Sequence, residues 1–411
     1  MPVLSENAFW EEIGMRAVGL TGYGGAELGE CIAAVNAVGD GGVDEWHEEW
    51  NRMAQRLDDE GRMAANQGRP TSARDALFRA ATYYRASYIP LYGKPVDERL
   101  RISFEAESVA FMAAAEINAD VATAPKIRSL EVPYEGGSLP GYLSAVDDSG
   151  RARATILQVN GYDSNVHEMY FSHAPAANSR GYNWIGVDGP GQGRNLIRDG
   201  LTLRPDWENV VGPILDAIEV LDEVDRERII LVGWSLGGYL APRAASFHSA
   251  RLAALVADPG LFDQRDVVVN RLPLSDDQKA RFPDVDPSSL DEMEAWLHSD
   301  QADPLLRWRL IQRGLWVNGV ENIFDYFSHL LEFRLSDVAG EITCPTLATM
   351  AEGDPLSAAA PRLIEAINAP GDVIEFTAAE GASGHCEGLN RRLYHERVFD
   401  WIQRNVPGDP A

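Results

Sequence analysis

Residues 229–241 read Ile229-Ile230-Leu231-Val232-Gly233-Trp234-Ser235-Leu236-Gly237-Gly238-Tyr239-Leu240-Ala241. Four apolar residues predict a buried strand, and the apolar pattern that follows predicts a helix, so Gly-x-Ser-x-Gly falls in a very tight turn between them. Gly233 and Gly237 allow a close approach of backbone and helix, and the strained turn points the hydroxyl of Ser235 out of the sheet. The pentapeptide also occurs by chance in loops, but its position between strand and helix makes Ser235 a candidate nucleophile.

Length and charge limit the kind of protein and its partners. The chain has 411 residues, enough for one large α/β domain and an accessory domain, and its 45% hydrophobic and 24% charged residues are an ordinary globular balance. The formal net charge is −27. Because nucleic acids and anionic membranes repel such a surface, we expect a small-molecule substrate, with neither nucleic acid nor a membrane as a partner.

The cysteines and the N-terminal residues indicate in which cellular compartment the protein is expected. Cys31, Cys344 and Cys386 are an odd set, far apart and without metal-ligand spacing, which fits a reducing compartment better than a disulfide framework. Residues 1–12 lack the basic and apolar regions of a signal peptide, and no apolar run approaches membrane-spanning length. We expect a soluble cytoplasmic protein.

Two apolar periodicities divide the chain. Residues 1–124 have helical spacing, as at Trp46, Trp50 and Leu57, and Ser72 with Asp75 resembles a helix-capping pair. Residues 125–260 and 339–411 follow another pattern, with a hairpin near residues 127–143 and then strands that alternate with helices. The strands are predicted at 155–159, 184–187, 229–232, 252–257, 346–350 and 373–376. This alternation predicts a doubly wound, mostly parallel α/β sheet, whose strand ends carry the active groups.

Residues 261–338 interrupt this alternation and are called the insert below. They are mostly helical, at 291–297 and 305–316, and rich in Trp and Phe. Such an insert is usually a cap over the strand ends, although peripheral packing is the alternative.

A serine nucleophile needs a base and an orienting acid, which follow it in chain order in this type of sheet. His385 lies in a small-residue loop after the last predicted strand and is the candidate base. Two acids compete for the orienting role. Asp354 follows the penultimate strand and is favoured because it directly precedes the unit with His385, whereas Asp258 ends an earlier strand. A turn or cap before proline is the structural alternative for each.

Oxyanion donors are expected from backbone N–H groups, those of Leu236 and Tyr162. Glu168 is a further candidate for contact with substrate, although Asn165 three residues earlier makes helix capping its alternative. Asn160 and Tyr84 are the other candidate substrate-binding residues, and core packing between helices is the favoured alternative for Tyr84.

The turn Val187-Asp188-Gly189-Pro190-Gly191-Gln192-Gly193 superficially resembles a nucleotide-binding loop. It lacks both the Gly-x-Gly-x-x-Gly spacing and a phosphate-loop lysine, so we interpret it as a structural turn.

Together, Asn160-Gly161-Tyr162-Asp163, the turn at 188–193, Gly-Trp-Ser235-Leu-Gly-Gly and Gly-His385-Cys-Glu resemble the α/β-hydrolase superfamily over residues 127–405. The similarity is to the branch of FrsA-like esterases, 2,6-dihydroxypseudooxynicotine hydrolase and fungal yellowish-green-type pigment hydrolases, in which residues 72–88 resemble a helix of the N-terminal domain. The resemblance implies an α/β-hydrolase fold with an N-terminal helical domain, a Ser235, Asp354, His385 triad, no cofactor and a homodimer. Asn160 stands where that branch often has a histidine.

The resemblance also implies cleavage of an ester or of a C–C bond beside a ketone. The sequence therefore predicts a serine hydrolase for a β-dicarbonyl, aromatic or polyketide-like substrate. The alternatives are a carboxylesterase or lactonase for a bulky ester, and a non-hydrolytic binding or cyclisation protein.

Overall fold

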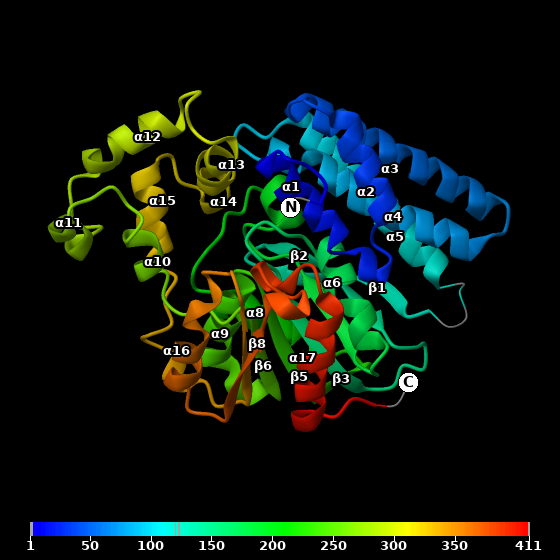
Figure 1. The fold of residues 1–411 in the computed structure, drawn as a ribbon. Coiled ribbons are helices and arrows are strands. Elements are labelled where there is room, and N and C mark those ends of the chain that lie inside the picture. The colour runs from blue at the N-terminus through cyan, green and yellow to red at the C-terminus, as the bar shows by residue number, and fades with distance from the viewer. Residues whose placement is uncertain (1–2, 120, 122–123, 410–411) are drawn as a thin grey trace.

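An eight-stranded sheet forms the centre of the protein, which a computed structural model describes at residues 3–119, 121 and 124–409 (Figure 1). The spatial order is β1-β2-β4-β3-β5-β6-β7-β8. β1 pairs with β2, and β2 with β4, in antiparallel register, and the other neighbours are parallel. The strands are β1 (Lys126–Tyr134), β2 (Gly137–Ala145), β3 (Arg153–Val159), β4 (Asn183–Val187), β5 (Val224–Trp234), β6 (Ala254–Asp258), β7 (Thr346–Ala351) and β8 (Gly371–Phe376). The predicted hairpin and mostly parallel sheet are confirmed.

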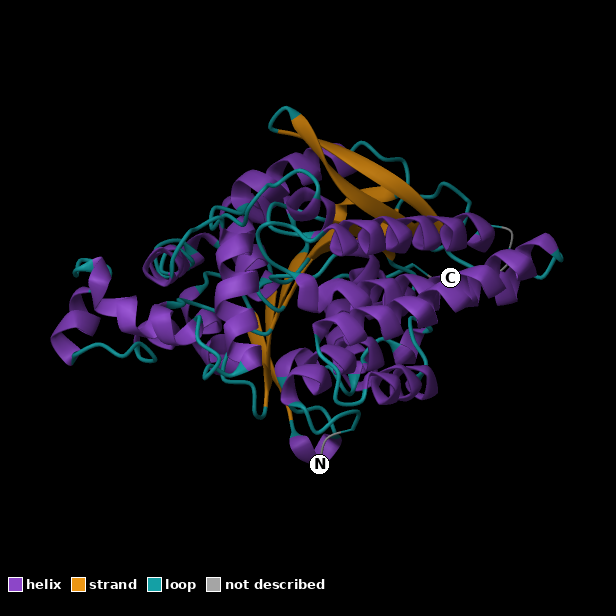
Figure 2. Ribbon diagram, turned by 90° about the horizontal axis from the view of Figure 1, so that it is seen from above, coloured by secondary structure: helices purple, strands orange, loops and turns teal. Residues whose placement is uncertain are grey.

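Helices cover both faces of this sheet (Figure 2). Every residue of β3, β4 and β6 is buried, as expected for strands that helices cover on both faces. The helices that connect the strands are α6 (Val166–Asn178), α7 (Gly193–Ile197), α8 (Glu208–Ile218), α9 (Gly237–His248) and α16 (Ala360–Ala366), and α17 (Arg391–Asn405) follows the last strand.

The N-terminal part is helical, as predicted. Its helices are α1 (Ala8–Val18), α2 (Leu28–Val38), α3 (Val43–Asn66), α4 (Pro70–Tyr88) and α5 (Glu98–Asn118), with the short η2 (Ile89–Leu91) after α4. Trp46 and Trp50 are fully buried, and Trp46 stacks on Trp10 of α1. The capping pair at Ser72 was wrong, because α4 already begins at Pro70, whose fixed φ suits the first helical position.

The insert lies between β6 and β7 and forms the arm on the left of Figure 1. Its outer helices have a small apolar core of their own, whereas Trp308 and Trp316 belong to the main core. Its elements are α10 (Arg265–Val269), α11 (Asp276–Arg281), α12 (Asp291–Leu297), α13 (Pro304–Arg307), the π-helix η5 (Trp308–Leu315), α14 (Trp316–Asn318) and α15 (Ile323–Leu330).

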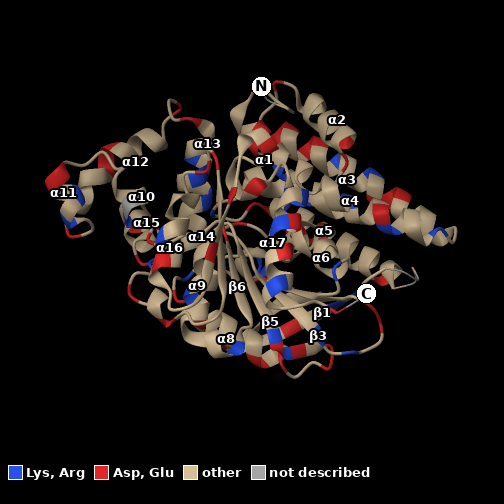
Figure 3. Ribbon diagram, turned by 60° about the horizontal axis from the view of Figure 1, so that its bottom comes forward, with Lys and Arg blue, Asp and Glu red and all other residues tan. Residues whose placement is uncertain are grey.

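Acidic residues are spread over the N-terminal helices and the insert, for example on α3 and α11 (Figure 3). No helix among the described residues is long and apolar enough to cross a membrane.

Candidate active site

The turn between β5 and α9 places Ser235 at the end of the central strand. Ser235 has a φ of 59°, in the left-handed region that costs energy for a residue with a side chain. Its N–H donates to the carbonyl of Asp258 at 2.6 Å, which fixes the turn to the end of β6. A Cβ on residue 233 would lie 1.9 Å from the carbonyl oxygen of Gly237. The tight turn therefore requires glycine at position 233, as the sequence indicated.

Ser235, His385 and Asp354 form a continuous chain of hydrogen bonds. The Oγ of Ser235 lies 2.8 Å from Nε2 of His385, and Nδ1 of His385 lies 2.8 Å from Oδ2 of Asp354. A carboxylate can only accept, so Nδ1 carries the proton and Nε2 is free to accept from the serine hydroxyl. The structure thus brings together the three side chains that sequence reasoning proposed as a triad.

Asp354 is held rigidly while His385 remains accessible. The Asp354 side chain is 3% exposed and that of His385 is 42% exposed. The backbone N–H of Leu356 donates to Oδ1 of Asp354 at 3.0 Å. The N–H of Gly384 donates to the carbonyl of Glu352 at 2.8 Å, which connects the loops after β7 and β8. The carboxylate is therefore preorganised to orient the imidazole.

Asp258, the competing acid, has other partners. Its carboxylate accepts from a nitrogen of Arg391 at 3.0 Å and from the hydroxyl of Thr349 at 2.9 Å, and its side chain is fully buried. This ion pair lies beneath the turn that carries Ser235. Asp258 therefore supports the turn, and the carboxylate that lies beside His385 is that of Asp354.

The turn after β3 approaches Ser235 closely. A Cβ on residue 161 would lie 2.9 Å from Cβ of Ser235, so this approach requires glycine. Tyr162 is the next residue, and Leu236 precedes α9, at the positive end of that helix dipole. The two expected oxyanion donors thus lie on backbone segments that flank the serine.

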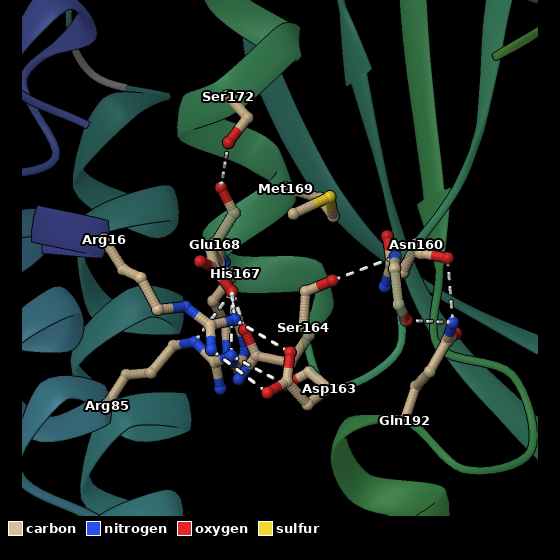
Figure 4. Close-up of polar contacts among 12 residues, drawn as sticks. Arg16, Arg85, Asn160, Asp163, Ser164, His167, Glu168, Met169, Ser172 and Gln192 are labelled. Atoms are coloured by element: carbon tan, nitrogen blue, oxygen red, sulfur yellow. Dashed lines mark hydrogen bonds and ion pairs between the residues drawn. The ribbon is translucent and has the colours of Figure 1, made fainter. Parts of the chain in front are cut away.

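Side chains from a neighbouring turn hold the turn after β3 (Figure 4). Nε2 of Gln192 donates to the carbonyls of Asn160 and Gly161 at 3.0 and 2.8 Å. Nδ2 of Asn160 donates to Oδ1 of Asp188 at 2.8 Å, and burial raises the pKa of Asp188 to about 7. These contacts agree with a structural role for the glycine-rich turn at 187–193.

The three side chains expected at the substrate lie elsewhere. Asn160 is fully buried against Asp188, and Tyr84 is buried in the N-terminal helices with its hydroxyl toward Gln55. Glu168 is buried and its Oε2 accepts from Arg85 at 2.7 Å, while its N–H is capped by Asn165. Arg85 occupies the Glu168 carboxylate, and none of the three side chains is exposed, so the structure does not support the expectation that they contact substrate.

Sequence reasoning missed the partners of Asp163. Its carboxylate pairs with Arg16 of α1 at 3.0 Å and with Arg313 of η5 at 2.9 Å. Burial by itself would raise the pKa of Asp163, but the charges of Arg16 and Arg313 outweigh burial and hold it well below its usual range. The partners are 147 and 150 residues away, so no local pattern could have indicated them.

Comparison with known proteins identifies the family to which this fold and this site belong. A profile described as "Alpha/beta hydrolase family" matches residues 159–395. The chain belongs to the alpha/beta hydrolase family, and we class it as a hydrolase.

Curated fungal relatives match most of the chain. "20-hydroxy-prefusarin hydrolase FUS2" of Gibberella moniliformis is 32% identical over 96% of this chain and 89% of its own. "Hydrolase acrC" of Aspergillus aculeatus is 30% identical over 94% of both chains. The crystal structure of 2,6-dihydroxy-pseudo-oxynicotine hydrolase superposes with a TM-score of 0.71 over 95% of each chain at 18% identity. That likeness shows the same fold, N-terminal helices included.

Substitution by asparagine should affect turnover at Asp354 and stability at Asp258. Asp354→Asn should lower kcat about 10³- to 10⁴-fold with little change in stability, because the amide cannot stabilise the imidazolium. Asp258→Asn should instead cost about 1–3 kcal/mol of stability, since Arg391 loses its nearer charged partner at 3.0 Å and keeps Glu387 at 3.7 Å. Turnover per folded molecule and urea unfolding measure the two effects. The reverse pattern would contradict this assignment.

Asp188 should make stability depend on pH. Its carboxyl ionises at about pH 4 in the unfolded chain but at about 7 when buried. Unfolding therefore releases a proton between these values, and the wild type should lose stability as the pH rises from about 4 to 7 and then level off. Asp188→Asn removes this titration. Urea unfolding measures the free energy of unfolding of both proteins. The difference between them should grow in favour of the variant from pH 5 to pH 8. A constant difference would contradict a raised pKa of Asp188.

Proposed function

We propose that this protein is a serine hydrolase that cleaves a C–C bond adjacent to a ketone through an acyl-enzyme on Ser235. The observation that carries the proposal is the hydrogen-bonded chain from Ser235 through His385 to Asp354, with 2.8 Å at both links. Burial of Asp354 and exposure of His385 support it, because the base must be oriented and still reach a substrate.

The reaction begins with attack on a carbonyl. Oγ of Ser235 bonds to the carbonyl carbon while Nε2 of His385 takes the hydroxyl proton, and Asp354 stabilises the imidazolium. The negative charge moves to the carbonyl oxygen, which the N–H groups of Leu236 and Tyr162 stabilise. This places the oxyanion between the turn after β3 and the start of α9.

Collapse of this intermediate breaks the bond to the leaving group. In a β-dicarbonyl substrate the C–C bonding electrons become an enolate, which the second carbonyl stabilises and the imidazolium protonates at carbon. Water then attacks the acyl-enzyme, with His385 as the base, and releases a carboxylic acid and free Ser235. The cycle consumes one water and needs no electron acceptor.

The proposed substrate is a bulky aromatic or polyketide-like β-dicarbonyl compound. The resemblance to a branch that implies cleavage of a C–C bond beside a ketone or of an ester is consistent with the carbon leaving group. The 32% identical relative is named a "20-hydroxy-prefusarin hydrolase", so its name gives 20-hydroxy-prefusarin as the compound on which that relative acts. A carboxylesterase or lactonase would use the same serine on an ester, so the leaving group decides between them.

A matched pair of substrates tests the leaving group. The kcat/KM for an aromatic β-diketone should exceed that for an ester of the same acyl group by about tenfold or more, because the site should stabilise the carbanionic leaving group. Ser235→Ala should abolish both activities and serves as the control. A ratio strongly in favour of the ester would contradict C–C cleavage and leave the esterase. Full activity of Ser235→Ala would contradict a serine hydrolase altogether.

A further inference from the structure

The residue after Tyr162 is held by side chains from outside the sheet. The carboxylate of Asp163 accepts from Arg16 through two bonds, at 3.1 and 3.0 Å, and from Arg313 at 2.9 Å. The carbonyl of Asp163 accepts from Arg85 at 2.8 Å and from the hydroxyl of Tyr92 at 3.3 Å. Figure 4 shows Arg16 and Arg85 meeting at Asp163. Both polar ends of this residue are thus fixed by the N-terminal helices and the insert.

The η5 π-helix of the insert also holds Tyr162 itself. The Tyr162 hydroxyl donates to the carbonyl of Gly314 at 3.4 Å and accepts from the side-chain amide of Asn318. The guanidinium of Arg313 lies 5.0 Å from the ring centre of Tyr162 and 4.7 Å from that of Trp308. Cation–π contacts of this kind are stronger when they are shielded from water. Arg313 therefore contacts both Tyr162 and Asp163 in the turn after β3.

The π-helical geometry places these groups. π-Helical turns are rare and often occur at functional sites. Here η5 brings Arg313 and the carbonyl of Gly314 to the same two loop residues. A Cβ on residue 314 would lie 2.8 Å from the carbonyl of Arg309, so the packing of η5 requires glycine at position 314.

We propose that Arg313 is a positioning residue that sets the Tyr162 amide at the oxyanion, so that the insert completes the oxyanion site rather than only covering it. This inference rests on the proposed serine hydrolase function. Preorganised donors act only when they already lie where charge develops, and a displacement of about 1 Å is enough to cost about 100-fold in rate. The contact between η5 and the turn after β3 is therefore needed for full catalytic activity.

Arg309 provides a matched control. It lies on the same π-helix and also forms an ion pair with α1, through Glu12, but this pair is partly exposed and does not contact the turn after β3. Arg309→Met therefore weakens the attachment of η5 to the N-terminal helices without touching Tyr162 or Asp163. Arg313→Met removes the contact with the loop. Arg313→Lys keeps a buried positive charge, so it protects the fold, but loses the planar guanidinium.

The test uses the full-length protein with a p-nitrophenyl ester, and active sites are counted with a fluorophosphonate. Arg313→Met should lower kcat per active site by about 10- to 100-fold, with KM changed by less than about threefold, because the lost interaction acts in the transition state. Binding of a trifluoromethyl ketone, which forms an oxyanion on Ser235, should weaken by a similar factor. Arg313→Lys should show an intermediate loss, and Arg309→Met should remain within about twofold of the wild type. The pH midpoint of kcat/KM should be the same in all three variants as in the wild type.

Two possible results would separate failure of the positioning role of Arg313 from failure of the proposed function. If Arg313→Met and Arg313→Lys match Arg309→Met in kcat and in ketone affinity, the positioning role is wrong while the serine mechanism stands. If Ser235→Ala hydrolyses the ester like the wild type, the proposed function fails, and this inference fails with it.

Discussion

The close approach of three backbone segments around Ser235 is the constraint on which the rest of the structure depends. β5, the turn after β3 and the start of α9 meet where added Cβ atoms on residues 161 and 233 would collide with neighbouring atoms. The strain of a left-handed serine is offset by bonds such as that from its N–H to the carbonyl of Asp258. Once this turn forms, the parallel order of β5, β6, β7 and β8 brings the loops with Asp354 and His385 to the same edge of the sheet.

Buried charge connects this core to the parts around it. Asp258 and Arg391 pair beneath the serine turn, and Asp163 is shared between Arg16 and Arg313 beside it. A buried charge without its partner is costly, so each pair specifies one arrangement of the elements that supply it. The N-terminal helices and the insert contribute to the turn after β3 in this way, although neither contributes to the chain from serine to aspartate.

The features that could be predicted from the sequence are those that local patterns and chain order determine. Gly-x-Ser-x-Gly after an apolar strand predicted the turn at Ser235, and chain order predicted that Asp354 and His385 would lie beside it. The placement of Asn160, Tyr84 and Glu168 could not be predicted, because burial and partners such as Arg85 depend on tertiary packing. The π-helix and the arginines around Asp163 also depend on tertiary packing, so no local sequence pattern predicted them.

The covalent intermediate on Ser235 is the central claim and can be observed directly. The enzyme should be mixed with an activated aromatic ester, quenched in acid within milliseconds and digested, and the peptide with Ser235 examined by mass spectrometry. We expect this peptide to gain the mass of the acyl group, the gain to disappear as hydrolysis proceeds, and Ser235→Ala to show no gain. An acyl group on another residue, or turnover without any acylated peptide, would contradict the account.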